Sequence, residues 1–267
     1  MIEREDAREI KTCCATFYQS DIVRLLLGDV LHPGGLELTG YLGTVVGLRS
    51  EDKVLDIACG RGASAVYLAK RVGCHVTGLD YGQDNITAAE SHAATESVAH
   101  LTAFKKGDAE GLPFEDESFD IVISECSFCT FPDKITAAQE IVRVLRRYGR
   151  MGMTDVTIDG PLPEDIQSLL GWVACLAGTG SSELYVSILE DAGFSDFIVE
   201  DKRDALLAMV NDIRRKLLGV ELVIGMAKLE LGDLDLAKAK SLAQRAQKLI
   251  ESGVIGYTLF KANKEEK

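Results

Sequence analysis

A glycine-rich turn that follows a short apolar strand constrains this chain more than any other feature. The apolar run 54–58 ends in Cys59-Gly60-Arg61-Gly62, and a helical pattern begins at Ala63. Glycine lets the backbone turn sharply between a strand and a helix, and it lets a ligand approach where a Cβ would block it. A strand, a glycine turn and a helix in this order are typical of an α/β domain with a parallel sheet.

Strands and helices alternate along the chain after this turn. The pattern predicts strands at 54–58, 75–79, 101–106, 119–124 and 150–156, separated by helices at 63–72, 84–97 and 134–145. Asp84 is the predicted N-cap of the second of these helices. This alternation predicts an α/β fold with a doubly wound, mostly parallel sheet and helices on both faces.

Helical segments flank and interrupt the alternating pattern. Residues 1–50 are predicted to form a helical N-terminal cap, and residues 51–267 a ligand-binding domain. Helical inserts are expected at about 161–178 and 203–253, before a late strand at 254–261. Such an isolated strand is compatible with an antiparallel strand on an otherwise parallel sheet. Two roles are open for the insert at 203–253: it covers the active site, or it forms a homodimer contact.

The charge of the chain argues against several kinds of partner. The 267 residues carry a formal net charge of −13, whereas nucleic-acid phosphates require clustered Lys and Arg. The same charge disfavours docking on an anionic membrane, and no uninterrupted apolar run approaches the length of a membrane span. The opening residues, Met1-Ile2-Glu3-Arg4, are charged where a secretory signal is apolar. We therefore expect a cytoplasmic protein with reduced cysteines that binds a small neutral or cationic molecule.

Acidic residues lie at the ends of three predicted strands. Asp56 lies in the first strand just before its turn, Asp80 closes the second, and Asp108 follows the third. The carboxyl ends of parallel strands meet at one edge of a sheet, where ligands of such folds bind. Asp80 can accept hydrogen bonds from two ribose hydroxyls, and Asp108 or the adjacent amide can meet an adenine edge. The predicted nucleoside site also contains Gly60, Gly62, Tyr81, Ala109 and Ser124.

The glycine turn by itself also fits a dinucleotide site, because Gly60-x-Gly62-x-x-Ala65 satisfies a loose form of that fingerprint. Asp56 opposes this interpretation, since a carboxylate beside the turn would repel a pyrophosphate but can hold a cationic amino-acid end. The segment Gly107-Asp108-Ala109 is also not needed by a dinucleotide. A nucleoside that carries a cation is therefore the favoured ligand.

Three segments of the chain, residues 54–62, 107–114 and 118–122, resemble class I S-adenosylmethionine-dependent methyltransferases. The resemblance implies the strand order 3-2-1-4-5-7-6 with an antiparallel last strand, and S-adenosylmethionine as the cofactor. It further implies that Asp56 and Gly60 face the methionine end of the cofactor. In the same way Asp80 would face the ribose, and Asp108 the adenine.

Two cysteines are expected near the methyl group. Cys126 follows the fourth predicted strand, and Cys175 lies in the insert at about 161–178. Soft thiolate ligands select soft, thiophilic centres, and arsenic(III) carries a lone pair that can attack a methyl sulfonium without a general base. The sequence shows no pairing of its four histidines with carboxylates, in keeping with such chemistry. We predict that Cys126 and Cys175 bind the acceptor.

Around these cysteines the chain is similar to arsenite methyltransferases. Cys126 followed by Pro132-Asp133-Lys134, and Trp172-x-x-Cys175-x-x-Gly178, match that family's two metalloid-binding cysteines. The resemblance also implies a third thiol from the N-terminal cap, Cys14 or its neighbour Cys13. No cysteine follows Cys175, which departs from the cysteine-bearing C-terminal region of that family. The expected acceptor is arsenite or a related trivalent metalloid.

Other interpretations stay open at this point. The acceptor could instead be a small organic thiol, amine or hydroxyl compound, with His32 or Glu125 as the base. A non-catalytic protein could hold the cofactor as a sensor or as a structural ligand. For Cys59 and Cys74, packing is favoured over chemistry, because both lie near core strand positions.

Overall fold

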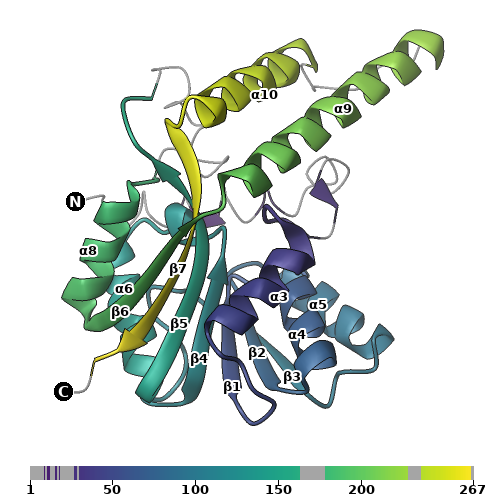
Figure 1. The fold of residues 1–267 in the computed structure, drawn as a ribbon. Coiled ribbons are helices and arrows are strands. Elements are labelled where there is room, and N and C mark those ends of the chain that lie inside the picture. Colours follow the sequence, from purple (N-terminus) through teal and green to yellow (C-terminus); the bar gives the residue numbers. More distant parts are fainter. Residues whose placement is uncertain are drawn as a thin grey trace.

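Seven strands in one sheet carry the site. They are β1 (Lys53–Ile57), β2 (His75–Asp80), β3 (Thr102–Lys106), β4 (Phe119–Glu125), β5 (Leu145–Ile158), β6 (Phe194–Asp201) and β7 (Ile255–Lys264). Their order in the sheet is β3-β2-β1-β4-β5-β7-β6 (Figure 1). Strand β7 is antiparallel to β5 and β6, and the other pairs are parallel. The predicted fold class, strand order and antiparallel strand are confirmed.

The computed structural model describes residues 30–162, 178–227 and 236–265, together with residues 9, 11, 12, 16, 18, 27 and 28. Most of the insert predicted at 161–178 therefore lies outside the described residues. Within the described ranges, no helix combines the length and the apolar character that crossing a bilayer requires.

Helices cover both faces of the sheet (Figure 1). One face carries α3 (Gly35–Val45), α4 (Ala63–Val72), α5 (Gln83–Thr95), α9 (Arg203–Ala227) and α10 (Leu236–Glu251). The other face carries α6 (Lys134–Val144) and α8 (Ser182–Ala192), with the short helix η1 (Phe128–Thr130) nearby. Helices α9 and α10 occupy the insert predicted at 203–253; they pack on each other and both contact β7.

Successive side chains along a strand point to opposite faces of the sheet, and each face has its own hydrophobic core. In β1, Val54 packs with the α3 and α4 side, whereas Leu55 and Ile57 pack with the α6 and α8 side. Successive residues of a strand point to opposite faces, so a strand that is covered on both sides reads as one continuous apolar run. This is why the run at 54–58 could be assigned to a central strand.

Two boundaries differ from the sequence-based predictions. The prediction that Asp84 caps its helix is wrong: Gly82 is the N-cap of α5, and Asp84 lies within the first turn. The reason is that the Asp80 carboxylate accepts a hydrogen bond from the Gly82 N–H and so starts the helix earlier. Strand β5 begins at Leu145 instead of at residue 150. Leu145 pairs with Phe119 and Arg150 pairs with Ile121, and the β5 residues between these two pairs form a bulge.

The packing of α3 on β5 gives a stability prediction. Leu42 of α3 is fully buried, and a Cβ on Gly152 of β5 would lie 3.0 Å from the Leu42 side chain. Leu42→Ala should therefore lower the free energy of unfolding by about 2–5 kcal/mol, measured by urea denaturation. The control Ile135→Ala, at an exposed position, should change it by less than about 0.5 kcal/mol. Equal effects of the two variants would contradict this assignment of the core.

Candidate active site

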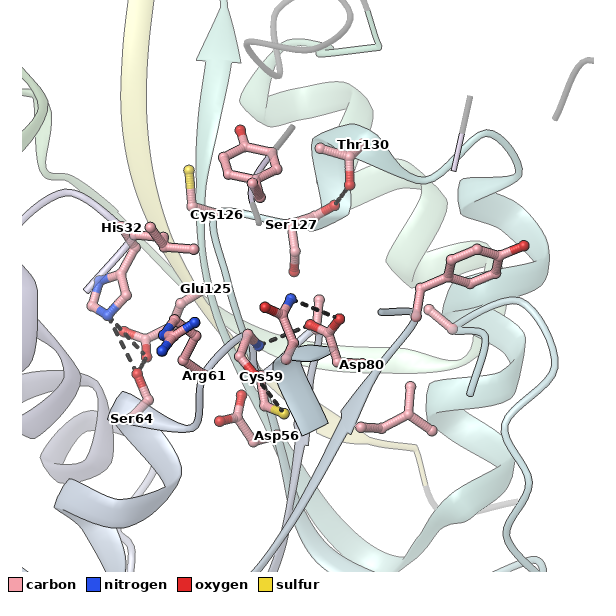
Figure 2. Close-up of a pocket in the computed structure, with 18 of the residues that line it drawn as sticks. His32, Asp56, Cys59, Arg61, Ser64, Asp80, Glu125, Cys126, Ser127 and Thr130 are labelled. Carbon is pink, nitrogen blue, oxygen red and sulfur yellow. Dashed lines mark hydrogen bonds and ion pairs between the residues drawn. The ribbon is translucent and has the colours of Figure 1, made fainter. Parts of the chain in front are cut away.

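A cavity opens at the carboxyl ends of β1, β2 and β4, with about 1110 Å³ of empty space when the solvent at its open mouth is included. The predicted site residues that line it are Asp56, Gly60, Asp80, Tyr81, Asp108, Ala109 and Cys126. Figure 2 shows Asp56, Asp80 and Cys126 at different places around this cavity. The structure therefore brings together most of the residues predicted from their positions after strands.

Gly62 and Ser124 are predicted site residues that do not line this cavity. A Cβ on Gly62 would lie 2.8 Å from the Ala89 Cβ and 3.1 Å from the Phe104 ring, and its φ is 78°. Gly62 therefore allows close packing behind the turn. Ser124 is buried, and its Oγ lies 2.6 Å from the Oγ of Ser127, which does line the cavity.

Asp80 accepts hydrogen bonds from two backbone groups and one side chain. Its Oδ2 accepts a hydrogen bond from the Gly60 N–H at 2.8 Å, and its Oδ1 accepts from the Gly82 N–H at 2.8 Å. The Asn85 side-chain amide donates a third bond at 3.0 Å. Burial raises the pKa of Asp80, and these three bonds oppose that rise. A carboxylate has about four acceptor positions, so Asp80 has roughly one left for a ligand.

Asn85 is a site residue that sequence reasoning missed. It is buried, lines the cavity, and its Oδ1 has no hydrogen-bond partner within the described part of the chain. A buried amide oxygen without a partner costs about 1–3 kcal/mol, so this oxygen is suited to accept a ligand hydroxyl next to Asp80. The available signal was its position in the first turn of the helix that follows Asp80.

Asp56 is a buried carboxylate whose Oδ2 also lacks a partner among the described residues. Burial, followed by the charges of Glu125 and Asp80, raises its pKa well above the usual range, against one backbone hydrogen bond from Ala65. A cationic group in the cavity would relieve both the missing hydrogen bond and the repulsion between the carboxylates.

Glu125, at the end of β4, is held by three side chains. The Ser64 hydroxyl donates to its Oε2 at 2.6 Å, and the Thr39 hydroxyl lies 3.1 Å from both carboxylate oxygens. His32 Nε2 lies 3.6 Å from Glu125 Oε2. The interpretation that no histidine pairs with a carboxylate is therefore wrong. His32 and Glu125 are far apart in the sequence, and only the packing of the segment before α3 over α4 brings them together.

Asp108 faces a lysine from the N-terminal segment. Lys11 Nζ lies 2.8 Å and 3.0 Å from the two Asp108 oxygens, and it also pairs with Glu110. Burial disfavours the charged lysine, but the hydrogen bonds with Asp108 and Glu110 outweigh this and raise the pKa of Lys11. The predicted contact of Asp108 with adenine remains a prediction, and Lys11 reaches the same end of the cavity.

Cys126 lies on the cavity wall with a strained backbone. Its φ is 54°, in the left-handed region, and its N–H donates to the Thr154 carbonyl at 2.6 Å. Figure 2 shows Cys126, Ser127 and Thr130 across the cavity from Asp56. Strained backbone of this kind concentrates at functional sites. The other predicted acceptor ligands, Cys175, Cys13 and Cys14, lie outside the described residues.

The two cysteines interpreted as packing residues have raised thiol pKa values. Burial, followed by the charges of Asp56 and Asp80, raises the pKa of Cys59 well above its usual range. Burial raises the pKa of Cys74, a core residue, to about 11. A thiol must lose its proton to bind a metalloid or act as a nucleophile, so neither residue is suited to that chemistry.

Together these groups can hold an elongated ligand that is polar at one end and cationic at the other. Hydroxyl donors fit the acceptors of Asp80 and Asn85, and a cation fits the environment of Asp56. The side that carries Cys126, Ser127 and Thr130 is left for a second, smaller molecule.

Comparison with known proteins identifies the family of this domain. Residues 48–193 match the family described as "Methyltransferase domain". The arsenite methyltransferase of Halobacterium salinarum is 32% identical over 160 residues, which cover 58% of this chain and 40% of that protein. The sarcosine/dimethylglycine N-methyltransferase of Halorhodospira halochloris is 32% identical over 171 residues, 64% of this chain and 61% of that protein. The chain thus spans less than two thirds of either relative.

A solved structure has the same fold. The crystal structure of a putative sarcosine dimethylglycine methyltransferase from Galdieria sulphuraria superposes with a TM-score of 0.79. The match covers 94% of this chain and 98% of that one, at 22% identity. At this identity the likeness concerns the fold.

The raised pKa of Asp56 gives a pH prediction. Because the folded chain holds this proton to a higher pH than the unfolded chain does, the contribution of Asp56 to stability falls as the pH rises above the unfolded pKa. Asp56→Asn removes this loss. The free energy of unfolding of the variant should therefore rise relative to that of the wild type as the pH increases above the unfolded pKa of about 4, measured by chemical unfolding. With the exposed Asp84→Asn as control, parallel pH curves for all three proteins would contradict the raised pKa.

Proposed function

The chain belongs to the methyltransferase domain family, and on this basis we propose that it transfers a methyl group from S-adenosylmethionine to a small acceptor. The observation that carries the proposal is the set of buried acceptors at adjacent strand ends, on Asp80, Asn85 and Asp56. They face one cavity, and two of their oxygens have no partner among the described residues.

The residues present fit this cofactor. Asp80 and Asn85 would hold the ribose hydroxyls, Asp108 the adenine, and Asp56 the cationic methionine end. At Gly60, whose φ is 52°, a Cβ would meet Leu31 at 3.8 Å, so the backbone there faces open space that a ligand can approach. When bound, the cofactor supplies an electrophilic methyl group on a positively charged sulfur.

The protein contributes position and surroundings. Its own side chains fix the two ends of the cavity, and Phe131 and Leu79 contribute apolar wall that excludes water. Holding two reactants in near-attack geometry can supply about 7–11 kcal/mol of the barrier. A transfer of this kind requires no nucleophile on the protein, only an acceptor atom with an available lone pair.

Trivalent arsenic is the first candidate acceptor. The Cys126 side chain lines the cavity on the side left for a second molecule, and soft sulfur ligands suit arsenic(III). Similarity to an arsenite methyltransferase supports this candidate. Cys175 and either Cys14 or Cys13 would complete the ligand set.

A small organic amine or hydroxyl compound is the second candidate. The hydroxyl-bearing residues Ser127 and Thr130 line the cavity beside Cys126 and can hydrogen-bond to such an acceptor. A neutral amine, like arsenite, has its own lone pair for the transfer. Similarity to a sarcosine/dimethylglycine N-methyltransferase supports this candidate.

Cofactor binding is the first test. Calorimetry should detect binding of S-adenosylhomocysteine, the demethylated cofactor, to the wild type. Asp80→Asn should weaken it by roughly 10–100-fold, because hydrogen bonds to a charged group are worth about 1.5–3 kcal/mol. The exposed neighbour Asp84→Asn should leave the affinity within about twofold. A wild type that binds neither S-adenosylmethionine nor its product would overturn the proposed function.

The acceptor is tested by a methylation screen with arsenite, a secondary amine and a small thiol. If arsenic is the acceptor, Cys126→Ser should lower arsenite methylation by at least ~10-fold, as loss of metal-site groups typically does. Cofactor affinity should stay unchanged, and the core variant Cys74→Ala should retain arsenite methylation. Methylation of the amine alone, insensitive to Cys126→Ser, would establish the second candidate and exclude the first.

A further inference from the structure

Four carboxylates stand in a row along the edge of the sheet where the cavity lies. Asp108 follows β3, Asp80 ends β2, Asp56 is in β1 and Glu125 ends β4, and these four strands are neighbours in that order. Adjacent strands are about 4.8 Å apart, so the row from β3 to β4 extends over roughly 14 Å. All four residues line the same cavity.

The order of this row matches the order of groups in the proposed cofactor. With adenine at Asp108 and ribose at Asp80, the next groups along the ligand are the sulfonium and then the amino-acid end. That end falls at Asp56 and Glu125. Ile57 of β1 pairs with Ser124 of β4, so the end of β4 is level with the glycine turn.

We propose that Glu125 is the counter-ion of the cofactor's α-ammonium group, an inference that rests on the proposed function. The side chain of Glu125 is only 4% exposed, and two hydroxyls fix its carboxylate. Each carboxylate oxygen has about two acceptor positions. Oε1, which accepts from Thr39, can therefore receive one further donor from the cavity.

His32 is a positioning residue in this arrangement. Its Nε2 lies 3.6 Å from Glu125 Oε2 and 3.3 Å from the Ser64 hydroxyl, and its Nδ1 lies 3.3 Å from the Pro33 carbonyl oxygen. Both ring nitrogens thus face protein groups. The geometry supports a role in orienting Glu125 over a role as a base that takes a proton from the acceptor.

A cation bound between Glu125 and Asp56 would be stabilised by both carboxylates. Asp56 lies close enough for the two charges to repel, and its Oδ2 is buried without a partner among the described residues. An ammonium group has three N–H donors and can satisfy both carboxylates at once. Arg61 also lines the cavity, so residues of both charges face the ligand.

The test uses two ligands that differ only in the ammonium group. They are S-adenosylhomocysteine and its analogue without the α-amino group, and calorimetry gives the dissociation constant of each. The wild type should bind S-adenosylhomocysteine about 10–100-fold more tightly than the analogue, as expected for a charge-assisted hydrogen bond. Glu125→Gln should reduce this ratio by at least about fivefold and leave the affinity for the analogue within about threefold.

Two control variants separate this role from a general loss of binding. Asp80→Asn should weaken both ligands equally and keep their ratio, because it acts at the ribose. Asp84→Asn should change neither constant. Retention of the wild-type ratio by Glu125→Gln would overturn the inference, and so would equal binding of the two ligands by the wild type. Failure of the wild type to bind S-adenosylhomocysteine would instead overturn the proposed function.

A second variant covers the case in which Glu125→Gln does not fold, as judged by circular dichroism and thermal unfolding. Glu125→Asp keeps the charge and the acceptor oxygens but withdraws them by one methylene group. The ratio of the two dissociation constants should then fall by about threefold or more, because the donor distance lengthens. An unchanged ratio would again overturn the inference.

Discussion

One buried carboxylate ties together the turns from which this site is built. Asp80 accepts hydrogen bonds from the backbone of Gly60, in the turn between β1 and α4, and of Gly82, at the start of α5. The Asn85 amide adds a third bond from the first turn of that helix. Burial of a charge is costly unless hydrogen bonds compensate, and here the compensating donors are the two loops that shape the cavity. The same bonds that stabilise Asp80 therefore set the geometry of the ligand site.

Much of the fold was predictable because it depends on local patterns. The apolar run at 54–58, the glycines that follow it and the acids at the strand ends are all contiguous features, and parallel strands bring their ends to one edge. The cavity lined by Asp56, Asp80 and Asp108 follows from this rule.

The parts that escaped prediction depend on contacts between distant segments. Lys11 meets Asp108 across 97 residues, and His32 meets Glu125 through the packing of the segment before α3. Nothing in the local sequence around His32 indicates a carboxylate partner. The wrong N-cap at Asp84 has a similar origin, since the start of α5 is set by Asp80, a residue of the preceding strand.

The two sides of the cavity differ in chemistry. The side formed by β1, β2 and their turns is rich in buried acceptors that face a cation with hydroxyl groups. The opposite side offers Cys126, Ser127 and Thr130, which are small and uncharged. The two relatives are similar to this chain over 160 and 171 residues, yet their names indicate acceptors as different as arsenite and sarcosine.

The position of β7 has a consequence for how the chain is made. Strand β6 ends at Asp201, but its hydrogen-bonded neighbour β7 begins only at Ile255 and lies between β5 and β6. On a ribosome, β1 to β5 can associate while synthesis continues, whereas β6 must wait through the whole of α9 and α10 for its partner. The late insertion of β7 between β5 and β6 closes a long loop, and pairing between strands far apart in sequence is slow. A nascent chain would thus expose the open edge of β5 to chaperones until β7 emerges.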